Sequence, residues 1–451
     1  MKPVIFLLFA GVLFFPISGK AQEKYTLNDL LKVAIENSHV MKKAALQQSE
    51  SSSKVKETQA NGLPQIEGAL NYSRMGVSKY FSDLDLSDDL LSTLSESTIA
   101  LLGSLSEIDA IHTTSADVTV SQLLFSQSYL TGVKQARKAE ELYSVLLLKT
   151  EDEVIQNVAS TYYQILASYS SLEILNKNID ALEKLYNILK LQYENDFVKK
   201  TDVNRLKVSV TNLKTRRESL QNGIQIQERI LKIISGMPID QEIVLDTREN
   251  QYDEKEHPTV GAFSLETLPD YQLLQKQIEL AELQIKSSKA SYYPNLVAFG
   301  QLSYSNYATD FSFNDFSNVN TIGLTATIPI FSSGMRKQQV FQSQLQFQQT
   351  QQDFELNSKY LETNYRNASN TLLSAWANLQ DQKENKELAN EVYEQVKLQF
   401  NEGMASLTDL LNVETSLLDA ENLFNQQLLK YKLAEIDLLK TTGQLKSLIN
   451  N

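Results

Sequence analysis

The sequence contains no cysteine, so the protein has neither a disulfide bond nor a thiolate metal ligand. A thiol nucleophile and an N-terminal cysteine that could carry a lipid are excluded for the same reason. Proline and glycine are also sparse, with 8 and 15 occurrences in 451 residues, and this composition favours long uninterrupted helices. We therefore expect the fold to be stabilised by packing alone.

Histidine is almost as scarce. His39, His112 and His257 are far apart in the sequence, on an expected helix, loop and linker. None of them has a second ligand at metal-binding spacing, and none belongs to a recognisable nucleophile triad. The sequence also lacks a phosphate-binding loop and a dinucleotide-binding fingerprint. We therefore expect no covalent chemistry, no bound metal and no cofactor.

Basic residues are fewer than acidic ones, with 42 lysines and arginines against 55 aspartates and glutamates, and the formal net charge is -13. Nucleic-acid binding requires a positive surface, so this balance argues against a nucleic-acid partner. Paired carboxylates such as Asp88 and Asp89 fall in an expected loop that also contains a helix-like stretch at residues 90–105. These carboxylates indicate a solvated acidic surface rather than an acid–base pair.

The sequence also has no long hydrophobic run. The apolar stretch at residues 4–15 follows Lys2, precedes the small residues Gly19 and Ala21, and is too short to span a bilayer. This pattern predicts a secretory signal peptide over residues 1–21, with an N-terminal anchor helix as the alternative. No later stretch approaches roughly 20 apolar residues, so we expect any crossing of a membrane to use β-strands.

The sequence does contain an internal repeat. Residues 191–202, LQYENDFVKKTD, align without a gap to residues 398–409, LQFNEGMASLTD. The same register persists to Gly236 and Gly443 further along. A duplication of this kind predicts that one structural unit occurs twice.

Each expected repeat consists of a helix, a strand, a loop, a second strand, a long helix, a turn and another long helix. The predicted boundaries are 22–236 for the first repeat, 237–264 for a connector and 265–451 for the second repeat. The repeats differ in the loop between their strands. This loop is long and acidic at residues 74–115 and short at residues 305–320.

Four segments alternate between apolar and polar residues. They are residues 65–73, residues 116–125, the run after Pro294 and residues 321–331. Alternation with a period of two predicts a sheet with one apolar and one polar face. Four strands cannot close on themselves, and open sheet edges are not tolerated in lipid. Either the strands pack against helices in water, or several chains pool their strands into one barrel.

The remaining segments favour very long helices. Residues 25–61 and 265–291 are expected helices that stop before a proline, and residues 126–194 contain no proline and a single glycine. At 1.5 Å per residue the last segment would form a helix of roughly 100 Å. Apolar residues recur at intervals of seven, as at Val158 and Ile165, which predicts knobs-into-holes packing between helices. Short turns make each pair an antiparallel hairpin, forming a rod or a wall shared with other subunits.

The two turns between long helices are candidate docking positions. They are Asn-Asp-Phe-Val at residues 195–198, the first tip, and Glu-Gly-Met-Ala at residues 402–405, the second tip. Each turn leaves an apolar residue, Phe197 or Met404, at an exposed end. Exposed apolar residues often mark a contact with a partner, although a turn also tolerates them without any function.

Each tip is followed by a threonine and an aspartate, Thr201-Asp202 in the first copy and Thr408-Asp409 in the second. The ordinary interpretation is that these residues cap the next helix or interact favourably with its dipole. The functional interpretation is a ring of carboxylates, one per subunit, that narrows the end of a tube and selects cations.

Over essentially the whole mature chain, these features resemble the TolC-type outer-membrane efflux protein family. The most specific is a turn glycine followed six residues later by an aspartate. Gly403 and Asp409 fit this pattern, whereas Asp196 stands where the glycine is usual and Asp202 is in place. The resemblance implies an α+β membrane protein that forms a homotrimer. Its trimeric 12-stranded β-barrel, with four strands per chain, would be continued by a long antiparallel α-helical barrel.

The resemblance also implies a location in the outer membrane, in contact with its lipid, with the helices extending into the periplasm. The tips would dock with a periplasmic adaptor bound to an inner-membrane pump of the resistance-nodulation-division or ABC type. The implied aperture residues are Asp409, Asn412, Thr201 and Asp202. The implied docking residues are Asp196, Phe197, Val198, Gly403, Met404 and Ala405.

Three positions depart from the family pattern around the second tip. Asn412 is neutral where a second acidic residue can sit, which weakens the aperture ring. Phe400 and Ala405 replace a tyrosine and an arginine that would link this tip to the first hairpin. We therefore expect the closed state to be held by different contacts or more loosely.

The sequence thus predicts the exit duct of a tripartite efflux or type I secretion system, which conducts passively and opens when a partner docks. A periplasmic coiled-coil adaptor or scaffold is the first alternative. It explains the helices but not the four strands, and the lipoyl-like domain usual between adaptor hairpin arms is not visible. A secreted enzyme with helical arms is the second alternative, and it lacks a catalytic site.

Overall fold

The computed structural model describes residues 24–76, 93–98, 110–247, 258, 260–308 and 314–450. The expected signal peptide at 1–21, the pair Asp88 and Asp89, and His257 lie outside these residues. The chain divides into two compact units. The hairpin unit comprises Met1–Ala44, Leu147–Pro269 and Lys359–Asn451, and the sheet unit comprises Ala45–Leu146 and Asp270–Ser358.

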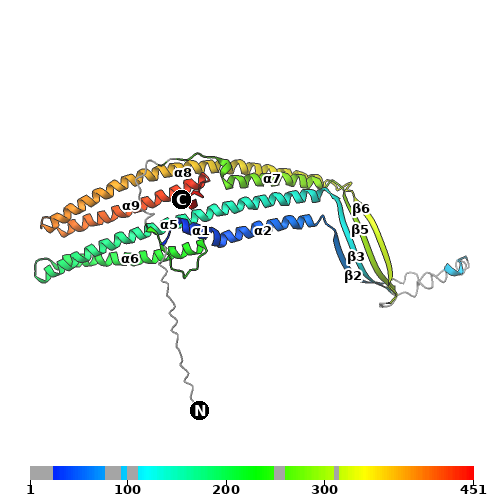
Figure 1. Ribbon diagram of the computed structural model, residues 1–451, viewed down its shortest axis with the longest axis horizontal. Helices are drawn as coiled ribbons and strands as arrows, with labels where there is room; N and C mark the ends of the chain where they lie inside the picture. Colours follow the sequence, from blue (N-terminus) through cyan, green and yellow to red (C-terminus); the bar gives the residue numbers. More distant parts are fainter. Residues whose placement is uncertain are drawn as a thin grey trace, which may run out of the picture. The chain divides into compact units, whose positions relative to one another are not determined.

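The sheet unit is built on one antiparallel sheet. Its strands lie side by side in the order β2 (Gln65–Gly76), β3 (Ala110–Ser126), β5 (Asn295–Ala308) and β6 (Ser317–Thr327) (Figure 1). The predicted alternation between faces is confirmed. One row of the polar face pairs Glu67 with Thr119, Thr119 with Gln301, and Gln301 with Thr321.

The opposite face of the sheet is apolar and uncovered. Leu70 of β2 and Ile322 of β6 are 87% and 92% exposed, so these strands do not bury their apolar residues against helices of their own chain. Within the described residues, β2 and β6 each pair with a single neighbour. Each therefore carries a row of unpaired backbone N–H and C=O groups along its outer edge.

The strands run further toward their loops than predicted. Pairing of β2 with β3 continues to Gly76 and Ala110, inside the expected loop 74–115. Pairing of β5 with β6 continues to Ser305 and Ser317, inside the expected loop 305–320. Where β3, β5 and β6 extend, Thr114 pairs with Asn306, and Ser305 pairs with both Ser115 and Ser317. Such residues resemble turn residues in the sequence, and the predicted strands were therefore too short.

Three further expectations about this region need correction or qualification. His112 lies in β3 rather than in a loop, and its Nδ1 is 2.8 Å from the hydroxyl oxygen of Tyr72. β6 ends at Thr327, not at residue 331. Of the helix-like stretch at 90–105, only residues 93–98 are described, and 96–98 of these are helical.

Two helical hairpins make up most of the remaining chain (Figure 1). The first hairpin joins α5 (Gln127–Glu194) to α6 (Lys200–Ser235), and the second joins α8 (Met335–Asn401) to α9 (Leu407–Thr441). The 68 residues of α5 correspond to about 100 Å of helix, as predicted. Among the described residues, none of the helices combines the length and the hydropathy that crossing a bilayer requires.

The predicted helix at 25–61 is broken into α1 (Leu27–Asn37) and α2 (His39–Ala60). Ser38 between them has an extended backbone, and its Oγ accepts a hydrogen bond of 3.1 Å from the N–H of Met41. Gly236, at φ 70°, packs against this break, and a Cβ there would lie 2.2 Å from the carbonyl oxygen of Asn37. Ser38 thus caps the start of α2 through a local contact that the sequence prediction did not use, and Gly236 packs closely against the break.

The second copy of this helix begins later than predicted. A short 3-10 helix, η2 (Leu265–Thr267), precedes α7 (Pro269–Ala290). Pro269 is the first residue of α7, where proline's missing N–H is unneeded and its fixed φ suits the helix. The predicted start at residue 265 was therefore wrong by four positions.

The connector contributes to the core of the hairpin unit. Its strand β4 (Val244–Leu245) pairs in parallel with β1 (Lys24–Tyr25), and the carbonyl of Asp246 accepts a 3.0 Å hydrogen bond from the buried hydroxyl of Tyr162. A short helix, α10 (Ser447–Asn450), ends the described chain. The largest fully buried residues of this core are Leu30, Leu31, Ile155, Tyr162, Ile165, Leu166, Leu231 and Leu445.

Candidate functional site: the helix-hairpin tips

Both tips are built by the same backbone turn. At the first tip, the N–H of Phe197 donates to the carbonyl of Gln192 at 2.9 Å, and Asp196 has φ 62°. At the second tip, the N–H of Met404 donates to the carbonyl of Gln399 at 2.8 Å, and Gly403 has φ 74°. Asp196 therefore adopts the left-handed conformation that favours glycine, which aspartate tolerates better than most residues.

The apolar residues of both tips are exposed, as the sequence predicted. Phe197 is 81% exposed and Met404 is 73% exposed. The residues that follow them, Val198 and Ala405, are half-buried. Val198 packs against buried side chains beneath the tips, so it supports the turn as well as lining it.

The two hairpins share a small core just behind the tips. Its buried residues are Leu182, Leu189, Val203, Leu206 and Val210 of the first hairpin and Leu407 of the second. Phe400 is half-buried and packs against this core. Phe400 thus contributes apolar packing at the position where the family resemblance implies a tyrosine.

Asp409 caps its own helix. Its Oδ2 accepts hydrogen bonds of 2.6 Å from the hydroxyl and 3.1 Å from the backbone N–H of Ser406, and its N–H donates back to Ser406 Oγ at 3.2 Å. These hydrogen bonds from Ser406 hold the pKa of the Asp409 carboxyl below its usual value, and the one from the hydroxyl has the larger effect. The carboxylate is therefore exposed, ionised and held in a fixed position at the start of α9.

The equivalent aspartate of the first hairpin is less constrained. The N-cap of α6 is Lys199, which makes no side-chain capping bond. Asp202 is half-buried and Thr201 is exposed. Within the described part of the chain, no hydrogen bond or ion pair joins either side chain to the second hairpin.

A contact that the sequence analysis missed joins the two hairpins near these residues. Arg205 Nη1 donates a 2.6 Å hydrogen bond to Thr408 Oγ1, and both side chains are exposed. In the gapless alignment of the two copies, Arg205 corresponds to Asn412 and Thr408 corresponds to Thr201. The sequence signal that could have revealed this contact is the difference in charge between Arg205 and its counterpart Asn412.

On α9, the predicted aperture residues Asp409 and Asn412 belong to an exposed polar face. Ser416 and Asp419 continue this face at helical spacing, and all four residues are exposed. Asp419 is a second carboxylate that the sequence analysis did not single out. The face can line an aqueous passage, because it carries acidic and neutral polar groups without an apolar or cationic residue.

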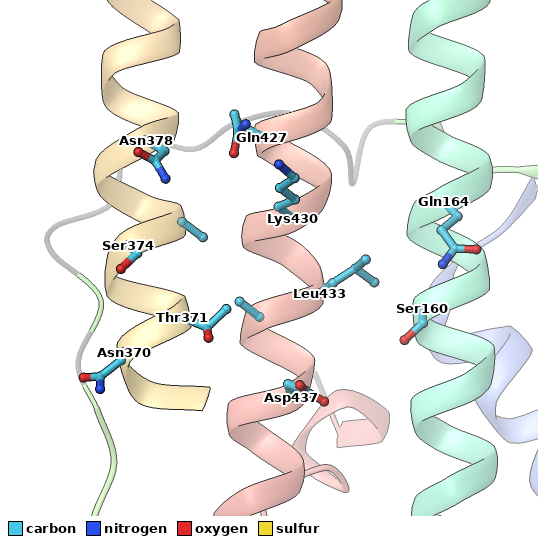
Figure 2. Close-up of a pocket in the computed structure, with 12 residues that line it drawn as sticks. Ser160, Gln164, Asn370, Thr371, Ser374, Asn378, Gln427, Lys430, Leu433 and Asp437 are labelled. Atoms are coloured by element: carbon cyan, nitrogen blue, oxygen red, sulfur yellow. The ribbon is translucent and has the colours of Figure 1, made fainter. Parts of the chain in front are cut away.

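A cavity of about 620 Å³ lies between α5, α8 and α9 (Figure 2). Asp437 at one end of it accepts a 3.0 Å hydrogen bond from the amide of Gln156. Within the described ranges, no three His, Cys, Asp or Glu side chains come together as metal ligands would. The polar residues of the cavity in Figure 2 are Ser160, Gln164, Asn370, Thr371, Ser374, Asn378, Gln427, Lys430 and Asp437.

Comparison with known proteins decides the family. The model of the outer membrane efflux protein family matches residues 30–232 and 264–444. The chain belongs to the outer membrane efflux protein family. The family resemblance drawn from the tips and the strands is therefore confirmed, and the protein is an outer-membrane efflux channel protein that extends into the periplasm.

Two curated relatives match most of the chain at low identity. Outer membrane protein TolC of Salmonella enteritidis is 23% identical over 354 residues, which cover 74% of this chain and 72% of the relative. Outer membrane protein TolC of Escherichia coli strain K12 is 21% identical over 344 residues, which cover 74% of this chain and 70% of the relative. The family is one of channels rather than of enzymes.

Solved channel structures share the fold. The Campylobacter jejuni CmeC outer membrane channel matches with a TM-score of 0.75 at 16% identity, over 93% of this chain and 85% of that chain. The open state of the Neisseria gonorrhoeae MtrE outer membrane channel matches with a TM-score of 0.70 at 16% identity, over 93% of this chain and 89% of that chain. These likenesses establish a predominantly helical α+β architecture.

Proposed function

We propose that three copies of this chain form the exit duct of a tripartite efflux or type I secretion system. The observation that carries the proposal is the open four-stranded sheet, with its uncovered apolar face and its two unpaired edges. Pairing β6 of one copy with β2 of the next satisfies both edges, and three copies give twelve strands. The apolar face would then contact outer-membrane lipid, and the polar face would line water.

The division into two repeats, 22–236 and 265–451, with the connector 237–264 between them, is part of the same proposal. The order of elements supports it, since helix, strand, strand, long helix and long helix follow one another twice. The lengths also agree, with 68 and 36 residues in α5 and α6 against 67 and 35 in α8 and α9.

The hairpin tips form the regulated end of the duct in this proposal. Asp409 and Asn412 line the aperture, with Thr201 and Asp202 as their counterparts on the first hairpin. The Ser406 capping box supports this role, because it keeps an ionised carboxylate fixed where α9 begins. A ring of such carboxylates, one per chain, would favour cations.

The exposed tip residues form the docking surface for a periplasmic adaptor that is bound to an inner-membrane pump. Phe197 and Met404 are its apolar contacts, and Asp196, Val198, Gly403 and Ala405 shape the two turns around them. Docking at this surface would separate the tips and shift the population toward the open state. Conduction through the duct would then be passive.

Electron microscopy of the protein extracted in detergent tests the assembly directly. Three-fold particles with a barrel at one end and a tube of about 100 Å are expected from the length of the helices. Monomers, or particles that are recovered without detergent, would contradict the shared barrel. That result would favour the alternative of a periplasmic coiled-coil adaptor or scaffold.

Docking is tested separately with the variants Phe197→Ser and Met404→Ser. Because both side chains are exposed, the variants should assemble and conduct like the wild type while they lose capture by tagged adaptors from the same cell. Leu130→Ser, an exposed apolar residue of α5 in the sheet unit, is the matched control. Undiminished adaptor capture by both tip variants would contradict the assigned docking surface.

A further inference from the structure

A second cavity, smaller than that in Figure 2, lies in the hairpin unit near the tips. Its volume is about 490 Å³, and α5, α8 and α9 bound it. This size suits a small organic molecule. Its walls combine charged and polar side chains with an apolar and aromatic part formed by Ala181, Leu182, Leu185, Ile188, Tyr393, Phe400 and Leu410.

One nearly buried side chain that carries a carboxyl group lines this cavity. Glu414 of α9 lines it and is 6% exposed. Within the described part of the chain, its carboxyl accepts no hydrogen bond, although a buried polar group normally has a partner. Burial raises the pKa of Glu414 to about 7, against the opposing influence of Lys397. The carboxyl oxygens are not fully enclosed, so the cavity offers a carboxyl group that a ligand can reach.

The charged groups at the rim are largely paired with one another. Lys177 of α5 forms an ion pair of 2.8 Å with Glu173. Lys397 of α8 forms one of 3.0 Å with Glu394, and its ammonium lies 5.1 Å from the centre of the Tyr393 ring.

The remaining rim charges, Asp180 and Lys184, have opposite signs and lie one turn apart on α5. The lining itself holds three lysines and two carboxyl groups, Asp180 and Glu414, and two of the lysines are paired with Glu173 and Glu394, which lie outside it.

We propose that this cavity binds an organic cation, a protonated amine whose ammonium group donates to the Glu414 carboxylate. Its apolar body would lie against Phe400, Tyr393 and the leucines of α5. A carboxylate and aromatic rings are the groups that recognise such cations, through charge-assisted hydrogen bonds and cation–π contacts. This site goes beyond the proposed duct function and does not depend on conduction.

Binding of an amine should be linked to release of a proton. Below about pH 7 the Glu414 carboxyl is mostly protonated, so the cation displaces that proton. The other shifted groups at the rim do not titrate in this range. Burial raises the pKa of Tyr393, and the carboxylates of Glu394 and Glu173 raise the pKa values of Lys397 and Lys177. Affinity for the amine should therefore increase as the pH rises through 7.

Isothermal titration calorimetry of the full chain in detergent tests the site. Benzylamine is compared with its uncharged analogue benzyl alcohol, at about pH 6 and about pH 8, in buffers that differ in ionisation enthalpy. We expect the amine to bind at least about ten-fold more tightly than the alcohol at the higher pH. At the lower pH, close to one proton should be released per amine bound, as linkage requires. Detergent partitioning would not release this proton.

Glu414→Gln keeps the shape of the side chain and should abolish both the preference for the amine and the proton release. Glu391→Gln, which changes an exposed carboxyl of α8 outside the cavity, should change neither. Leu185→Trp narrows the cavity without touching the carboxyl and should weaken binding of both compounds. Equal affinities for amine and alcohol, or proton release that survives in Glu414→Gln, would overturn the proposal.

Discussion

Removing the hydrogen bond between Arg205 and Thr408 should loosen the contact between the two hairpin tips. The bond is short, at 2.6 Å, and its donor is charged, but both side chains are exposed. A hydrogen bond to a charged group contributes about 1.5–3 kcal/mol, whereas an exposed ion pair contributes about 0.2–1 kcal/mol. We therefore assign about 1 kcal/mol per chain, which corresponds to about a five-fold change in an equilibrium constant.

The variants Arg205→Ala and Thr408→Val each remove this bond, and valine keeps the shape of threonine. In the proposed trimer, three bonds broken together correspond to about 3 kcal/mol, or about a 150-fold change. Single-channel recording in planar bilayers should therefore show the ratio of open to closed time rising by about five-fold to about 150-fold. The lower value is expected if the chains open independently, and the higher value if they open together.

Combining the two substitutions should add little, since both remove the same interaction. Arg216→Ala is the matched control, because Arg216 is an exposed arginine of α6 further from the tip and forms no ion pair within the described residues. Opening like the wild type in both single variants would refute the reasoning. An equal effect of Arg216→Ala would refute it as well.

Three further predictions concern single positions. Asp409→Ala should raise conductance and weaken cation preference in bilayer recordings, whereas Ser406→Ala should cost only about 1 kcal/mol of helix capping and leave the preference intact; unchanged selectivity in the aspartate variant would contradict the aperture. Glu414 has a raised pKa in the folded state, so its stabilising contribution is full below its ordinary value of 4.5 and is lost as pH rises through about 7. In denaturant titrations, a rise to alkaline pH should therefore lower the free energy of unfolding of the wild type by up to about 3 kcal/mol more than that of Glu414→Gln. Parallel pH profiles of the two proteins would contradict this. Gly236→Ala should lower the thermal midpoint, because φ is 70° and the added Cβ would lie 2.2 Å from a backbone oxygen. Gly223→Ala, with open space around it in α6, should instead stabilise the helix by about 0.5–1 kcal/mol, and equal midpoints for the two variants would be inconsistent with the described packing.

The sequence predicted the elements of this fold wherever a local period was strong. Alternation placed all four strands, and the scarcity of proline and glycine placed α5 with its end at Glu194. Of the two interpretations of the aspartate after the second tip, the helix-start one agrees with the structure, since Asp409 occupies the third position of α9, and the aperture role stays a prediction. These signals are local, because each depends on residues within one or two turns of one another.

Features that depend on tertiary contacts were missed. The close contact of Gly236 with the break at Ser38 joins residues about two hundred positions apart in the sequence. The bond from Arg205 to Thr408 likewise requires two hairpins to pack against each other. The carboxyl of Glu414 is buried by residues of three helices, and its spacing alone does not distinguish it from an exposed glutamate.

The two unpaired edges of the sheet have a consequence for how substitutions act. In the proposed ring, every junction brings β2 of one chain against β6 of another, and the three junctions are identical by symmetry. A substitution on either edge is therefore present at all three junctions at once, and its energetic effect is multiplied by the number of copies. A single substitution that weakens either edge is therefore expected to weaken the assembly at all three junctions together.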